Sequence, residues 1–140
     1  MKAQEELEKI LTHDALIECK TEELARLISL AEKMTAAMGG ESVQRSRNLD
    51  PLGDALVRIT QKEQEIERLK AEHSQREKYY SDIIAGLNKP VFIKILYGRY
   101  FVGKSLKKIA KEEGFCYRNI CYLHGNALQA VENAEKRQEK

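Results

Sequence analysis

The sequence predicts an all-α protein, and two observations support this prediction. Before residue 39, apolar residues recur at three- and four-residue spacing, for example at Leu24, Leu27, Ala31 and Met34, which places them on one face of a helix. The stretch from Leu52 to Leu87 follows a seven-residue repeat in which most seam positions are apolar. We therefore expect an N-terminal helix, a long coiled-coil helix and a module of three shorter helices.

Glycine, proline and polar clusters divide the chain into segments. Gly39 and Gly40 stop the first helix, and Asp50 and Pro51 suit the N-cap and the first turn of the next one. Thr21 offers a cap inside the first segment, which is therefore either one helix or two. The predicted segments are an N-terminal helical segment (1–38), a flexible linker (39–53), a coiled-coil helix (54–88), a compact three-helix module (89–133) and a charged, frayed tail (134–140).

The coiled-coil helix needs a partner for its seam. Eight of the eleven seam positions are apolar, and the exceptions are Lys62, His73 and Arg76. A helix of about 36 residues spans about 54 Å, which is too long for one small core. The seam must pair with the N-terminal helix, with a second copy or with another protein, and we favour a homodimer. The seam positions are Leu52, Ala55, Ile59, Lys62, Ile66, Leu69, His73, Arg76, Tyr80, Ile83 and Leu87.

Charge is distributed unevenly along the chain. Residues 1–38 carry five basic and eight acidic side chains, whereas residues 89–131 carry eight basic and two acidic ones. A compact basic segment of this kind is typical of proteins that bind the phosphate backbone of nucleic acid. A solvated basic surface is the alternative interpretation.

Several functional classes find no support in the sequence. Three cysteines without a paired framework indicate free thiols and a cytoplasmic location, and no apolar run has transmembrane length. The G-x-S-x-G, P-loop, Rossmann and H-E-x-x-H motifs do not occur, so we expect no enzyme and no cofactor. Cys116, Cys121 and His124 offer three ligands where structural zinc normally takes four, so we expect no metal.

The compact module contains two short helices joined by a tight turn, after a helix that Pro90 begins and Gly103 ends. Ser105 can cap the first of the two, and Gly114 supplies the positive backbone angle of the turn. The second begins near Tyr117. This is the helix-turn-helix arrangement, whose second helix enters the DNA major groove. The residues expected to point inward are Phe92, Ile95, Leu96, Tyr100, Ile109, Ala110, Phe115, Ile120, Leu123, Ala127, Leu128 and Val131.

Two positions depart from the usual helix-turn-helix pattern, and a third residue is unfavourable inside a helix. Glu113 stands where an apolar residue is common, and Cys116 stands where Ser or Thr would cap the second helix, which costs about 1 kcal/mol. Gly125 lies inside the second helix, where glycine is unfavourable by roughly 1 kcal/mol. We expect close backbone packing to explain Gly125.

The run LYGRYFVGKSLKKIAKEEGFCYRNICYLHGNALQAVE resembles region 4 of sigma-70-type factors. It is most similar to the small phage-encoded late-gene regulators of the ArpU and RinA type and their uncharacterised relatives. The matching positions are Arg99–Tyr100, Gly103–Lys104–Ser105, Ile109–Ala110, Gly114–Phe115, Tyr117–Arg118, Ile120–Cys121, His124–Gly125 and Ala127–Leu128. The resemblance implies a sigma-region-4-like fold, a phage or prophage origin and a role in transcription.

Helix geometry then predicts which side chains contact double-stranded DNA, with the recognition helix over residues 117–131. The expected base contacts are Tyr117, Arg118, Cys121 and Tyr122. The expected backbone contacts are Lys104, Lys107, Lys108, Lys111 and Asn119. Host RNA polymerase is a candidate second partner. The two rival interpretations are a DNA-packaging protein similar to a small terminase and an interaction protein that uses the same motif to bind polymerase.

Overall fold

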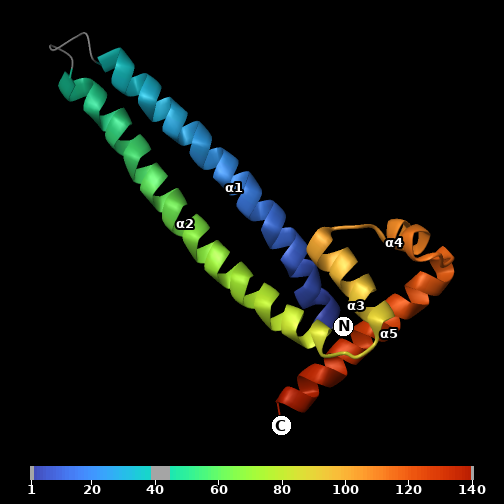
Figure 1. Cartoon of the computed structure of the whole chain (residues 1–140). Coiled ribbons are helices and arrows are strands. Elements are labelled where there is room, and N and C mark those ends of the chain that lie inside the picture. The colour runs from blue at the N-terminus through green and yellow to red at the C-terminus, as the bar shows by residue number, and fades with distance from the viewer. Residues whose placement is uncertain (1, 39–44, 140) are drawn as a thin grey trace. The chain divides into compact units, whose positions relative to one another are not determined.

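The computed structural model describes residues 2–38 and 45–139, with side chains described from residue 51 onward in the second range (Figure 1). All of its regular elements are helices, which confirms the all-α prediction, and the first segment is one helix. The elements are α1 (Lys2–Met38), α2 (Arg45–Ala85), α3 (Pro90–Tyr97), the π-helix η1 (Gly98–Val102), α4 (Leu106–Glu113) and α5 (Tyr117–Gln138). No described helix is long and apolar enough to cross a membrane.

The chain forms two compact units. One contains residues 15–72, and the other contains the start of α1 up to Asp14 together with the chain from His73 onward. Helices α1 and α2 each contribute a segment to both units. We describe each unit by itself.

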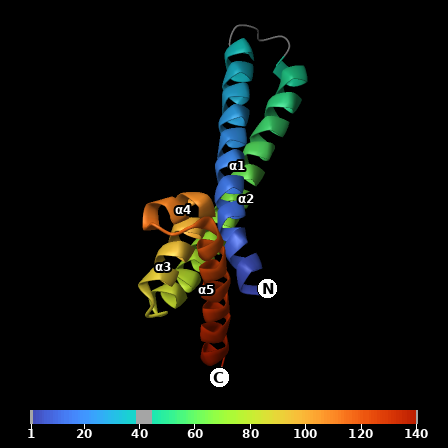
Figure 2. The same ribbon diagram turned by 90° about the vertical axis from the view of Figure 1, so that its right-hand side faces the viewer.

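In the unit of residues 15–72, α1 and α2 form an antiparallel hairpin (Figures 1 and 2). The predicted seam of α2 faces α1, because Ala55 and Ile66 are buried and the other seam residues of this unit are half-buried. Lys62 keeps its stem in the seam and extends its ammonium to Glu23, at 2.9 Å. The seam is therefore filled within the chain. The homodimer that we favoured from the sequence would need a different surface.

Helix α2 begins earlier than predicted. It includes Arg45 and the following residues of the predicted linker. The rest of that linker, 39–44, lies outside the described residues. Pro51 lies inside α2 rather than at its start. Proline removes one backbone hydrogen bond and strains the preceding turn. A helix of 41 residues, packed along α1 through its described side chains, tolerates this local loss.

In the other unit, α3 and α4 both pack against α5 (Figure 2). The main core joins the start of α1 to the end of α2 and to α3, η1 and α5. Its most deeply buried large side chains are Leu7, Ile10, Ile84, Leu96, Tyr100 and Val131. The predicted inward stripe of the first module helix is confirmed, since Phe92, Ile95, Leu96 and Tyr100 are all buried.

Carboxylates lie beside the two remaining polar seam residues in this unit. Arg76 Nε lies 3.3 Å from a carboxylate oxygen of Glu6, and this contact contributes to lowering the pKa of Glu6, behind the larger effect of Lys9. His73 Nε2 lies 2.9 Å from Glu77, one helical turn further along α2. The charged partner thus explains how the seam tolerates Arg76, whereas the two buried ring nitrogens of His73 make no hydrogen bond within the described residues.

The end of the chain is more ordered than predicted. Helix α5 continues to Gln138, and Glu135 is buried although the sequence placed it in a frayed tail. The hydroxyls of Tyr79 and Tyr80 each donate to Glu135 Oε2 at 3.4 Å. Burial, with Glu135 as the second cause, raises the pKa of Tyr80. These long-range contacts hold the last turns of α5 against α2.

Candidate nucleic-acid interface

Helices α4 and α5 follow one another with a short turn between them, at the positions where the sequence predicted two consecutive helices. Ser105 is the N-cap of α4, and its hydroxyl accepts the backbone N–H of Lys108 at 3.1 Å. Gly114 ends α4 with φ of 75°, in the left-handed region that glycine adopts without a steric penalty. The backbone N–H of Phe115 then donates to the carbonyl of Ala110 at 2.9 Å. Three residues therefore suffice to connect α4 to α5.

A small second core fixes the crossing of α4 and α5. It consists of Ile95, Ile109, Ala110 and Ile120, with Leu123 packed at its edge. Three of the predicted inside residues of α4 and α5, namely Ile109, Ala110 and Ile120, are thus confirmed in this core, and Leu123 is half-buried. Phe115 is a correction, because its side chain is 39% exposed. It lies in the turn, directly after Gly114, and is not part of this core.

The unusual positions have different explanations. Glu113 lies 3.6 Å from Lys94 Nζ, so its carboxylate has an ionic partner on α3. Cys116 occupies the N-cap of α5 and makes no side-chain cap hydrogen bond, as the sequence predicted. Our explanation of Gly125 was wrong, because a Cβ built there meets no atom within 4 Å.

The first two turns of α5 expose most of the predicted base-contacting side chains. Tyr117, Arg118 and Asn119 are exposed, and Tyr122 is 68% exposed. Cys121 is half-buried, and its side-chain hydrogen bond with Tyr117 raises the pKa of that phenol. Cys121 is therefore the least accessible of the four predicted base contacts.

Helix α4 brings basic side chains beside this part of α5. The Lys107 ammonium lies 5.8 Å from the centre of the Tyr117 ring, within the range of a cation–π contact. Within the described residues, no carboxylate lies at ion-pair distance from Lys107, Lys108 or Lys111. Lys104 differs, because it pairs with Glu112 at 2.8 Å and lowers the pKa of that carboxyl. Lys104 is thus the least available of the predicted backbone contacts.

The structure adds Arg99 to the basic residues near the interface. A hollow of about 310 Å³ beside the start of α4 is lined by Arg99, Ser105, Leu106, Lys107 and Tyr117. Arg99 Nη1 donates to the carbonyl of Lys104 at 3.4 Å, which orients its guanidinium. From the sequence, Arg99 was one of the basic residues of the module and part of the matching motif. Its position beside Lys107 depends on the fold and could not be predicted.

A buried polar pair ties η1 to α5. The Tyr100 hydroxyl lies 2.7 Å from His124 Nε2, and the two rings stack with their centres 5.7 Å apart. Burial lowers the pKa of His124 and raises the pKa of Tyr100 to about 12. The ring is therefore neutral and the phenol protonated near neutral pH, so the phenol can donate to Nε2. His124 has a structural partner in this pair.

The described residues contain no group of three or more His, Cys, Asp or Glu side chains arranged to hold a metal ion. Comparison with protein-family models, with curated protein sequences and with solved structures finds no match to this chain.

Proposed function

We propose that this protein binds double-stranded DNA sequence-specifically, as a transcriptional regulator of phage or prophage origin, with residues 117–131 of α5 in the major groove. One observation carries the DNA-binding part. The Lys107 ammonium lies over the Tyr117 ring, so the exposed lysines of α4 and the exposed start of α5 belong to one continuous surface. A helix-turn-helix unit places these two groups on the phosphate backbone and on base edges, respectively. The regulatory role and origin rest on the resemblance to phage regulators.

Each group of side chains has a distinct role in this proposal. Arg118 projects from the first turn of α5 and can bond bidentately to guanine, which discriminates by about 1–3 kcal/mol against another base. Tyr117 and Tyr122 offer apolar ring surface to thymine methyl groups and hydroxyls to phosphates. Lys107, Lys108 and Lys111 contact the backbone and set the salt dependence of binding. Arg99 joins this backbone-contacting set.

Binding to a randomised DNA library, measured with the full chain from low to physiological salt, tests the proposal. We expect affinity to fall steeply with salt, because each neutralised phosphate releases counterions. Arg118→Ala should flatten the sequence preference, whereas Lys107→Ala with Lys108→Ala should weaken binding to all sequences alike. The matched control is Arg68→Ala with Lys70→Ala, which removes the same charge from exposed positions of α2.

Three results would contradict parts of the proposal. Affinity that does not change with salt, or equal losses in the Lys107/Lys108 variant and in the Arg68/Lys70 control, would exclude backbone binding by α4. A uniform loss across all sequences in Arg118→Ala would make Arg118 a backbone contact and leave the base-reading role unassigned.

A protein-binding role has one observation in its favour. Tyr97 and Phe101 stack with ring centres 5.0 Å apart, and Tyr97 and Val102 are exposed beside this stack. Exposed aromatic residues are typical of protein interfaces, and host RNA polymerase is the partner that the resemblance suggests. Capture of purified polymerase by the wild-type chain, lost in Tyr97→Ser and unchanged in Arg118→Ala, would support this second role.

A further inference from the structure

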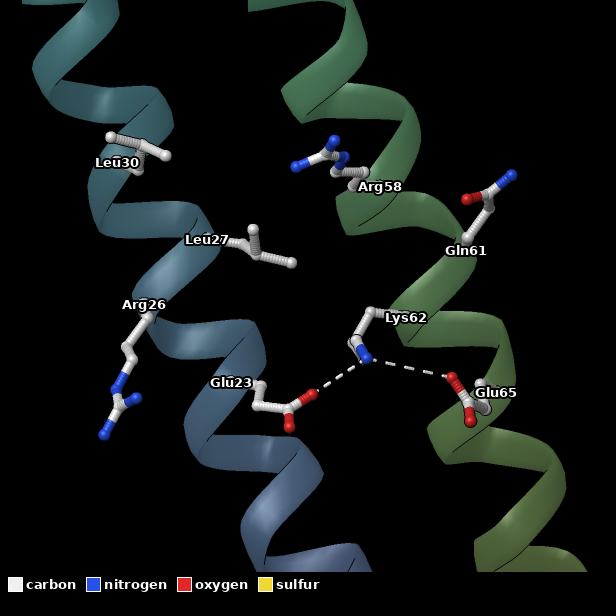
Figure 3. Close-up of a pocket in the computed structure, with 8 residues that line it drawn as sticks. All are labelled: Glu23, Arg26, Leu27, Leu30, Arg58, Gln61, Lys62 and Glu65. Atoms are coloured by element: carbon white, nitrogen blue, oxygen red, sulfur yellow. Dashed lines mark hydrogen bonds and ion pairs between the residues drawn. The ribbon is translucent and has the colours of Figure 1, made fainter.

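The hairpin of residues 15–72 carries a groove on one flank of its seam (Figure 3). The groove has a volume of about 490 Å³. Leu27 of α1 and Arg58 of α2 point into the space between the two helices. Apart from Lys62, the α2 residues that line the groove lie outside the seam that already pairs within the chain. Its lining residues are Glu23, Arg26, Leu27, Leu30, Arg58, Gln61, Lys62 and Glu65.

The residues on this flank repeat every seven positions. On α1, Leu16, Glu23 and Leu30 occupy equivalent heptad positions, and Leu16 and Leu30 are 39% and 46% exposed. On α2, Arg58 and Glu65 are also seven residues apart. Seven residues return to nearly the same side of a helix, so both sets face the same flank. The flank therefore presents two exposed leucines on α1 and two opposite charges on α2.

This pattern matches itself when the hairpin is rotated by a two-fold axis. On α1, Leu16 and Leu30 lie equally far in sequence from Glu23. On α2, the midpoint between Arg58 and Glu65 lies beside Lys62. Because Lys62 contacts Glu23, the two midpoints lie at the same height along the hairpin. A two-fold axis that crosses the hairpin at this height places each helix antiparallel to the same helix of the second copy. It places Leu30 against Leu16 of the second copy, and the reverse contact follows by symmetry.

The same axis satisfies the charges. Arg58 then lies opposite Glu65 of the second copy, and this contact also occurs twice. Glu65 already accepts Lys20 of its own chain at 2.7 Å, but a carboxylate has lone pairs for a second donor. The two Glu23 carboxylates near the axis each keep Lys62 at 2.9 Å, which offsets their repulsion.

We propose that two copies of this chain pair through this flank, with α1 and α2 each antiparallel to its own copy in a four-helix contact. The charge pattern favours a second copy over an acidic or a basic partner helix. A partner of one sign would oppose either the arginines or the carboxylates with a like charge. The leucines span 14 residues of α1, or about 21 Å, which gives the contact an apolar line along its length. This proposal does not depend on DNA binding.

Charge reversal with rescue tests the pairing in sedimentation experiments on the full chain. We expect a wild-type dimer at micromolar concentration. Arg58→Glu and Glu65→Arg should each raise the dissociation constant by roughly tenfold or more, because two ion pairs become two like-charge contacts. An equimolar mixture of the two variants should restore the dimer, since every contact in the mixed pair is again between opposite charges.

Matched controls separate this effect from misfolding. Arg68→Glu and Glu63→Arg reverse the same charges at exposed positions of α2 outside the groove lining and should leave the dimer intact. Each variant is also checked for helix content by circular dichroism. A monomeric wild type, or two variants that separate but do not rescue one another, would overturn the proposed pairing.

A crosslink tests where the axis lies. In a chain whose three cysteines are replaced by serine, Glu23→Cys should form a disulfide-linked dimer on mild oxidation, because residue 23 meets its own copy at the axis. Thr21→Cys, at an exposed position on the other flank of α1, should stay monomeric under the same conditions. Equal crosslinking at both positions, or none at residue 23, would overturn the antiparallel arrangement.

Discussion

Gly114 and Gly125 allow the same substitution to be made twice with opposite expected outcomes. A Cβ added at either position meets no atom within 4 Å, so neither alanine variant suffers a steric clash. The difference lies in the backbone. Gly114 has φ of 75°, whereas Gly125 lies inside helix α5. Any change in the free energy of unfolding therefore reports the backbone conformation alone.

The two magnitudes follow from these conformations. Gly114→Ala should lower the free energy of unfolding by about 1–2 kcal/mol, which is the cost of a left-handed conformation for a residue with a Cβ. Gly114→Asn should cost less, because asparagine visits this region more readily. Gly125→Ala should raise the free energy of unfolding by about 0.5–1 kcal/mol, since alanine replaces glycine in a helix interior.

Urea unfolding followed by circular dichroism measures all three variants on one scale. The transition midpoint should fall for Gly114→Ala and rise for Gly125→Ala, while the slope stays constant. A neutral or stabilised Gly114→Ala would refute the left-handed turn between α4 and α5. A destabilised Gly125→Ala would show that α5 has a close neighbour at this position.

Two further predictions concern the buried pair of Tyr100 and His124. Tyr100→Phe should lower the free energy of unfolding by about 1–3 kcal/mol, because it leaves the imidazole nitrogen of His124 buried without its partner, and thermal unfolding measures this change. Burial lowers the pKa of His124 in the folded chain. Below about pH 6.5 the unfolded chain therefore takes up a proton at this imidazole more readily than the folded chain does. The free energy of unfolding, which is at its full value at about pH 7, should decline as the pH falls below about 6.5. His124→Gln should flatten this decline in urea titrations between pH 7 and 5, and an unchanged pH profile would mean that another group is responsible.

The features predicted correctly from sequence are those that depend on short-range spacing. The cap at Ser105, the left-handed Gly114 and the small Ala110 each follow from the requirements of one helix end or one close crossing. The seam of α2 was also predicted correctly, because a seven-residue repeat defines one face of a helix whatever covers it. Spacing alone could not decide among α1, a second copy and another protein as the partner of that seam.

The errors concern contacts between residues that are distant in sequence. Phe115 was placed inside because it is large and apolar, but its side chain is 39% exposed and is not part of the small core of Ile95, Ile109, Ala110 and Ile120. Glu135 was assigned to a frayed tail because its partner Tyr80 lies 55 residues away. Pro51 was taken as a helix start because proline favours that position, and no local pattern shows that α2 continues through it.

The start of α1 belongs to the same compact unit as α4 and α5, although the sequence assigned it to a separate segment. Leu7 and Ile10 are almost completely buried in the same core as Leu128 and Val131 of α5. The backbone N–H of Ala3 also donates to a carboxylate oxygen of Glu132 at 3.2 Å. The second half of α5 therefore takes its support from α1, while its first turns are held by α4 through Ile109 and Ile120. A fragment that starts at residue 89 would expose one side of α5, so DNA binding has to be measured on the full chain.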